Sequence, residues 1–162
     1  MEYNISTLAL KISELLKARS ETIAVAESSS GGLISAALLA VPGASAYFKG
    51  GGVVYTRDAK RILMRVSEAQ MVAIRPATEA HALDLGRAAK KSLGSDWGIG
   101  ETGAAGPEGN RYGDLAGHSA IGIAGRSEVS LVVNTESKKR YENMVAFATA
   151  ALDLLYGTLK KY

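Results

Sequence analysis

The chain has 162 residues, of which 47% are apolar and 22% charged, with 18 glycines, three prolines and no cysteine. This composition predicts one globular domain over residues 1–162, and it excludes disulfides, thiolate metal sites and a cysteine nucleophile. A net charge of +3, without a basic stripe, gives no indication of a nucleic-acid partner. The N-terminus shows no signal-peptide pattern and no apolar run reaches the ~20 residues that span a bilayer, so we expect a cytoplasmic protein with no membrane partner.

The first elements in chain order are a helix, a buried strand and a second helix. Apolar residues at helical spacing predict an amphipathic helix over residues 3–19. The β-branched run ending at Glu27 predicts a strand, and residues 33–40 predict the helix that follows. Between them lies a turn with three serines and two glycines, which can bind a phosphate or carboxylate through its backbone N–H groups. Helix capping by the serines explains the same turn without any ligand.

The rest of the chain alternates between strand and helix patterns. We expect a glycine-interrupted strand over 46–56, helices over 57–64, 67–72, 77–93 and 137–159, a short strand over 97–100, and a hairpin of residues 116–124 and 129–134. Helices thus bracket strands throughout. This order predicts a three-layer α/β/α domain with a mixed, mainly parallel sheet of about five strands.

The decapeptide of residues 101–110 is too glycine-rich to predict regular structure. It follows a buried strand directly, which is where α/β proteins place ligand loops. The overlapping segment 98–103 matches G-x-G-x-x-G, but no helix pattern opens inside it, so we interpret that match as coincidence.

Few side chains are candidates for catalysis. The two histidines, His81 and His118, lack metal-ligand spacing, so no metal site is expected and neither is selected for a catalytic triad. A serine with a lysine base remains, provided that the lysine pKa is lowered by its surroundings. Ser45, Tyr55 and Lys60 flank the glycine-interrupted strand, but each also resembles an ordinary turn, strand or helix residue.

Four segments in order carry a resemblance to a known family. They are AESSSGG at 26–32, PGASAYF at 42–48, GGVVYTRDAK at 51–60 and TGAAGPEG at 102–109. Together they resemble the motifs of the CinA C-terminal domain family, the family of the competence/damage-inducible protein CinA, which includes stand-alone nicotinamide mononucleotide amidases. The resemblance spans nearly the whole chain.

The resemblance implies an amidohydrolase that converts nicotinamide mononucleotide to nicotinate mononucleotide and ammonia, in pyridine nucleotide salvage, without a cofactor or metal. The family's nucleophile falls on Ser45, its base on Lys60 and its tyrosine on Tyr55. The residues implied to enclose the nucleotide-like substrate are Glu27, Ser28, Ser30, Gly31, Gly32, Thr102, Gly103, Gly106 and Arg140.

The chain also departs from the family pattern. Arg57 replaces an asparagine, exchanging a planar amide for a long cation, and an arginine usual in the last helix is absent. We expect Arg57 to supply a substrate-binding cation in its place. The alternative interpretation is a non-catalytic relative that binds a nucleotide-like anion as a regulatory or interaction module. The amphipathic terminal helices further suggest a homo-oligomer.

Overall fold

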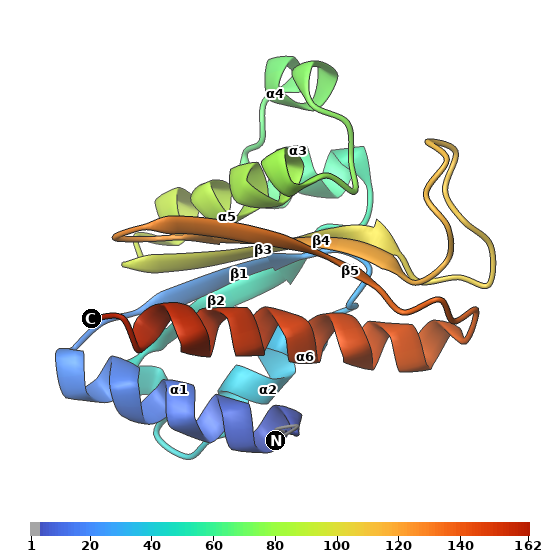
Figure 1. Cartoon of the computed structure of the whole chain (residues 1–162). Coiled ribbons are helices and arrows are strands. Elements are labelled where there is room, and N and C mark those ends of the chain that lie inside the picture. The colour runs from blue at the N-terminus through green and yellow to red at the C-terminus, as the bar shows by residue number, and fades with distance from the viewer. Residues whose placement is uncertain (1–3) are drawn as a thin grey trace.

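The computed structural model describes residues 4–162 and consists of a five-stranded sheet between two layers of helices (Figure 1). The strands are β1 (Ile23–Glu27), β2 (Phe48–Val53), β3 (Trp97–Ala104), β4 (His118–Ala124) and β5 (Glu128–Asn134). Their order across the sheet is β2-β1-β3-β4-β5. The β2–β1 and β1–β3 pairs are parallel and the β3–β4 and β4–β5 pairs are antiparallel, so β4 runs opposite to the other four. The predicted architecture is confirmed.

Helices lie on both faces of the sheet (Figure 1). One layer contains α1 (Ile5–Arg19), α2 (Leu33–Leu39) and α6 (Arg140–Leu159), and the other contains α3 (Arg57–Met64) and α5 (Glu79–Leu93). Helix α4 (Glu68–Ala73) stands beyond α3 and α5, away from the strands (Figure 1). A short 3-10 helix, Ala44–Ala46, leads into β2. The helix expected over 3–19 begins at Ile5 behind an Asn4 cap, while Tyr3 lies outside the described residues.

The two faces of the sheet differ in side-chain size. Ile23 and Val25 of β1 face the large core beneath α1 and α6, whereas Ala24 and Ala26 face a smaller cluster near α5. A Cβ on Gly98 or Gly100 would clash with the α5 backbone. Small residues therefore let α5 lie directly against the sheet.

Strand β3 extends further than the sequence predicts. Residues 101–104 were expected to be irregular, yet they belong to the strand and pair with β4 from Ile121 to His118. The glycine content misled the prediction because Gly103 packs closely against the β4 backbone at His118 and Ser119. The irregular loop begins at Ala105, one residue beyond the strand.

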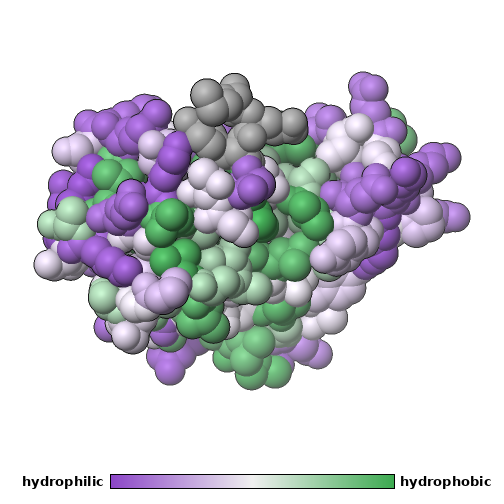
Figure 2. All heavy atoms as spheres, turned by 90° about the horizontal axis from the view of Figure 1, so that it is seen from below, coloured by the Kyte–Doolittle hydropathy of each residue, from purple (hydrophilic) through white to green (hydrophobic). Residues whose placement is uncertain are grey.

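The face formed by α1, α2 and α6 has an apolar band between more polar ends (Figure 2). Leu10 of α1 and Leu39 of α2 are among its exposed apolar side chains. Such a band is a candidate surface for self-association. Among the described residues, none of the helices combines the length and apolar character needed to cross a lipid bilayer.

Candidate active site

Two buried glutamates mark the carboxyl ends of neighbouring parallel strands. Glu27 ends β1, Glu101 lies in β3, and the two residues pair directly in the sheet register. Both side chains are completely buried. In open α/β sheets, the carboxyl ends of the strands are the usual place for a ligand site, so the surroundings of these two residues define the candidate site.

The Glu27 carboxylate caps the start of α2 from inside the protein. It accepts hydrogen bonds from the backbone N–H groups of Gly32, Ile34 and Ser35, at 2.8–3.0 Å. The hydroxyls of Ser30 and Ser35 add two more bonds at 2.7 and 2.8 Å. A negative charge at a helix N-terminus is stabilised both by these donors and by the helix dipole.

Glu101 holds the serine turn in the same way. Its carboxylate accepts hydrogen bonds from the backbone N–H groups of Ser28 and Ser30 at 3.0 and 2.9 Å. It also accepts the hydroxyls of Ser29, Ser30 and Ser119. Glu101 was not among the predicted site residues, although an acid in the middle of a buried strand is rare enough to have been a signal.

These bonds change the interpretation of the serine turn. The backbone N–H groups of Gly32 and Ser30, which could have bound a phosphate or carboxylate of a ligand, donate to the protein's own buried carboxylates instead. Within residues 4–162 the Ser28 hydroxyl has no hydrogen-bond partner, unlike the hydroxyls of Ser29 and Ser30. The turn is thus a rigid wall of the site with one free hydroxyl.

Lys60 is the buried base of the region. It lies in α3, the residue is 4% exposed, and its side-chain amine makes no hydrogen bond within residues 4–162. Burial lowers the pKa of Lys60, with a further lowering by the Arg57 charge and an opposing effect from Glu101. A lysine of this kind loses its proton more readily than one in water and can act as a general base.

His81 lies in the first turn of α5, within range of the charge on Lys60 of α3. The side chain is 1% exposed, and neither ring nitrogen has a hydrogen-bond partner within the described part of the chain. Burial and the nearby Lys60 charge lower the pKa of His81 to about 4. The imidazole is therefore neutral at pH 7. Its sequence context, one histidine in an alanine-rich helix, carried no signal for this position.

Tyr55 and Arg140 come together from distant parts of the chain. Tyr55 is 59% exposed just after β2, and its hydroxyl accepts a hydrogen bond from the Arg140 guanidinium at 3.4 Å. Arg140 also donates to the Gly106 carbonyl at 2.5 Å, so the loop after β3 is tied to the start of α6. Arg57, expected to face the substrate, instead pairs with Glu68 of α4 at 2.7 Å.

Ser45 is separated from Lys60 by a whole strand. It is exposed in the 3-10 helix before β2, whereas Tyr55 and Lys60 follow the other end of that strand. At ~3.3 Å per residue, the strand alone puts roughly 16 Å between its ends. The two residues on which the family's nucleophile and base fall therefore lie at opposite ends of β2 within a single chain.

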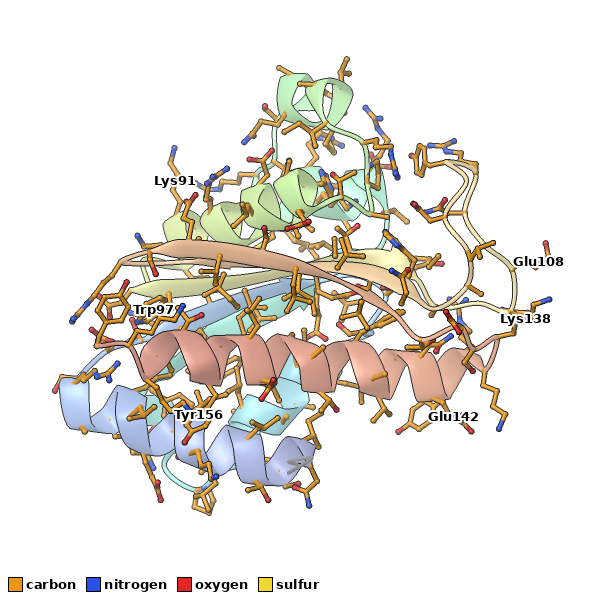
Figure 3. The ribbon with its side chains drawn as sticks, in the orientation of Figure 1. Lys91, Trp97, Glu108, Lys138, Glu142 and Tyr156 are labelled. Carbon is orange, nitrogen blue, oxygen red and sulfur yellow. The ribbon has the colours of Figure 1, made fainter. Side chains whose placement is uncertain are left out.

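The loop after β3 borders a cavity of about 670 Å³. Its lining residues are Pro107, Glu108, Gly109, Leu115, Ala116, Glu136 and Lys138. Figure 3 shows Glu108 and Lys138 at this end of the molecule, near the start of α6. The volume suits a small ligand, but Lys60, Tyr55 and Ser45 do not line it, so the cavity and the base are distinct features.

The remaining predicted binding residues have structural contacts. The Thr102 hydroxyl is buried and accepts the backbone N–H of Ala77 at 3.1 Å, which anchors the segment before α5. Gly31 adopts a φ of 66°, and a Cβ there would press on Met144 of α6. Residues 4–162 contain no group of three or more acidic or histidine side chains placed to hold a metal ion.

Comparison with known proteins identifies the family. The model of the CinA C-terminal domain matches residues 5–159. The chain belongs to the CinA C-terminal domain family. A CinA-like protein of Gloeobacter violaceus is 36% identical over 151 residues, covering 92% of this chain and 35% of that protein. A CinA-like protein of Chlorobium limicola is also 36% identical, covering 91% and 35%. This CinA-type chain thus spans about a third of the length of these relatives.

Solved structures of the CinA superfamily have the same fold. The competence/damage-inducible protein CihA from Agrobacterium tumefaciens superimposes with a TM-score of 0.88 at 27% identity, covering 99% of each chain. A CinA superfamily protein from Klebsiella pneumoniae gives 0.91 at 24% identity, covering 99% of this chain and 100% of that one. The mixed sheet and its helical layers are therefore those of the CinA fold.

Proposed function

We propose that this CinA-type domain is a serine amidohydrolase that cleaves the carboxamide of nicotinamide mononucleotide, releasing ammonia and nicotinate mononucleotide. The observation that carries the proposal is the buried Lys60, whose pKa is lowered by burial at the carboxyl end of the sheet. The assignment of nicotinamide mononucleotide as the substrate comes from the motif resemblance, and the buried lysine supports amide hydrolysis with a general base. The proposed compartment is the cytoplasm, where nucleotide salvage takes place.

The reaction needs a base that is neutral before catalysis and charged during it. Neutral Lys60 removes the proton from a serine hydroxyl while the oxygen attacks the carboxamide carbon. The C–N bond then breaks, and the proton on Lys60 leaves with the nitrogen as ammonia. Water attacks the resulting ester, returns a proton to the serine oxygen and frees the carboxylic acid. Atoms and charge balance without a metal or cofactor.

Two serines compete for the role of nucleophile. The family motif favours Ser45, which lies at the far end of β2 from Lys60 in the same chain. Ser28 has a free hydroxyl, and its backbone N–H binds Glu101, the carboxylate that also acts on Lys60. Ser45 fits the role if a second copy brings it to the Lys60 of its partner.

The geometry of β2 provides a way for a second copy to do this. The strand is at the edge of the sheet, and Val53, Tyr55 and Leu63 are exposed beside it. Two such edges placed antiparallel around a twofold axis would set the start of one strand beside the end of the other. We therefore propose a homodimer along β2, in which Ser45 of each copy serves the Lys60 of the other.

The proposal is tested by following ammonia release from nicotinamide mononucleotide. The parent protein should release ammonia and Lys60→Met should not, because Met fills the same space without a basic nitrogen. Loss in Ser45→Ala but not in Ser28→Ala assigns the nucleophile to Ser45, and the reverse result assigns it to Ser28. Absence of release by the well-folded parent would reject the amidase function.

Mixing variants separates the two nucleophile assignments further. If Ser45 acts across a dimer, an equimolar exchange of Ser45→Ala with Lys60→Met subunits restores about a quarter of the parent activity, since half of the dimers carry one intact site. If Ser28 acts within one chain, exchange of Ser28→Ala with Lys60→Met subunits restores none.

The non-catalytic alternative rests on Arg57. Arg57 pairs with Glu68 on an exposed surface, which supports the alternative because this cation is engaged outside the proposed site. Calorimetric binding of nicotinamide mononucleotide without ammonia release, combined with unaltered binding by Lys60→Met, would favour a binding module over an enzyme.

A further inference from the structure

A second cavity, of about 360 Å³, lies between α5 and the segment that joins α3 to α4. Lys91 is one of its lining residues, and Figure 3 shows this side chain projecting from α5 away from the sheet. None of the candidate catalytic residues Ser45, Tyr55 and Lys60 lines the cavity. Its volume lies within the range of small-molecule sites. The cavity is therefore a possible binding site separate from the candidate active site.

The polar side chains around this cavity offer donors without acceptors of their own. The side-chain oxygen of Gln70 is already engaged, because it accepts the backbone N–H and the hydroxyl of Ser67 at 2.9 and 3.1 Å. This leaves the Gln70 NH₂ group for the cavity. The side chains of Arg65 and Lys91 make no hydrogen bond or ion pair within residues 4–162. A group that only accepts hydrogen bonds would complement these donors.

The charges around the cavity favour an anion. The cationic lining residues are Arg65, Arg87 and Lys91. Arg87 is neutralised inside the protein, since it donates to the buried Asp84 at 3.1 Å and to Glu128 at 2.7 Å. Arg65 and Lys91 therefore remain as two cations that no carboxylate of the described chain binds.

Arg65 occupies a backbone position that usually favours glycine. It ends α3 with a φ of 55°, in the left-handed region, and its backbone N–H donates to the Lys60 carbonyl. Glycine is common at such helix ends because a Cβ disfavours this conformation. The backbone preference therefore does not explain an arginine here, which points to a use of its side chain.

We propose that this cavity binds a phosphate group, free or as the ester of a small molecule, through the side chains of Arg65, Gln70 and Lys91. A guanidinium group binds phosphate oxygens with paired N–H donors, and an ammonium group adds a second charge. A phosphate monoester carries a charge of about −1.5 to −2 at pH 7, which matches the two free cations. Met64 and Ala88 of the lining offer apolar surface to the organic part of an ester. The site does not depend on the proposed amidase function.

The first test is a titration of the ¹⁵N-labelled parent with sodium phosphate and, separately, with glycerol 3-phosphate, followed by backbone amide NMR shifts. We expect saturable shifts at residues 64–70 and 87–92. Tighter binding of glycerol 3-phosphate would identify an ester as the ligand, and equal affinities would identify the phosphate group alone. Absence of saturable binding by both probes would overturn the proposal. Shifts confined to the loop after β3 and the start of α6 would also overturn it.

The second test replaces the assigned donors. Arg65→Gly and Lys91→Gln should each raise the Kd of glycerol 3-phosphate about tenfold or more, because a charge-assisted hydrogen bond is lost. Glycine suits the backbone at position 65 and Lys91 is exposed on α5, so thermal unfolding should show that both variants fold.

Arg61→Gln is the matched control on the same helix. Arg61 pairs with Asp58 at 3.4 Å and does not line the cavity, so the Kd should stay within about twofold of the parent value. A parent-like Kd in either Arg65→Gly or Lys91→Gln would contradict the assigned site.

Discussion

The carboxylates at the end of the sheet and the bases beside α5 are both buried, but their surroundings are opposite. Glu27 and Glu101 are saturated with hydrogen bonds from the turn that they hold. The side chains of Lys60 and His81 have no hydrogen-bond partners within residues 4–162, and burial lowers the pKa of each. A satisfied group gives rigidity, whereas an unsatisfied base is held away from its charged form. The carboxylate cluster is therefore the scaffold, and Lys60 is the proposed reactive group.

The sharpest way to break the scaffold is to replace Glu101. In Glu101→Gln an amide NH₂ would face donors that need an acceptor, leaving several buried groups unpaired at about 1–3 kcal/mol each. We expect the free energy of unfolding to fall by roughly 4 kcal/mol in urea titrations. The exposed Glu108→Gln is the matched control and should stay within about 0.5 kcal/mol of the parent. Equal, small losses in both variants would contradict the scaffold role.

The buried His81 should make the free energy of unfolding sensitive to acid. The His81 pKa is about 4 in the folded state against an ordinary 6.5. As pH falls from 6.5 to 4, the unfolded chain takes up a proton that the folded chain does not, so folding loses stability across this window. The loss from this residue approaches about 3 kcal/mol.

The measurement is the difference between the urea stability curves of the parent and His81→Leu from pH 7 to 4. Subtraction cancels the carboxylates common to both proteins. The parent should lose more stability than the variant as pH falls. Parallel curves would show that His81 is protonated as easily when folded as when unfolded.

The close approach of α5 to the sheet, which fixes His81 in place, is tested by glycine substitution. A Cβ on Gly100 would clash with the Ala82 carbonyl of α5, so Gly100→Ala should destabilise by about 2 kcal/mol. Gly157→Ala in α6 meets open space and should stabilise by up to ~1 kcal/mol. Thermal unfolding should show these opposite signs; a stable Gly100→Ala would mean that the helix does not need this contact.

The smallest effect is expected from the exposed ion pair. Arg57 and Glu68 have side chains that are 50% and 62% exposed, and such pairs contribute little. Arg57→Ala should change the free energy of unfolding by no more than about 0.5 kcal/mol in urea titrations. A loss comparable to that of Glu101→Gln would erase the distinction between buried and exposed carboxylates.

The sequence predicted the fold well because its signals are local. Helical spacing of apolar residues placed α1, α5 and α6 within a few residues of their observed bounds. The error over residues 101–104 has a physical reason: Gly103 packs closely against the β4 backbone, a contact that a single sequence does not display.

The site was less predictable because it depends on long-range contacts. The sequence pointed to the serine turn and to Lys60. The carboxylate that accepts the hydrogen bonds of the turn, however, belongs to Glu101, about 70 residues away in the sequence. His81 becomes distinctive only once burial removes its partners and places it near Lys60. Motif resemblance grouped Ser45 with Lys60 without revealing the strand between them.

The proposed reaction depends most directly on the protonation of Lys60. The measurement is the pKa of its side chain, read from the Cε and Nζ NMR shifts of the folded parent against those of Lys60→Met, which identifies the signals by their loss. We predict a value below the ordinary lysine pKa of 10.5, because burial outweighs the attraction of Glu101. A pKa at or above 10.5 would contradict the account, since Lys60 would then be an ordinary charged lysine and no base for the reaction.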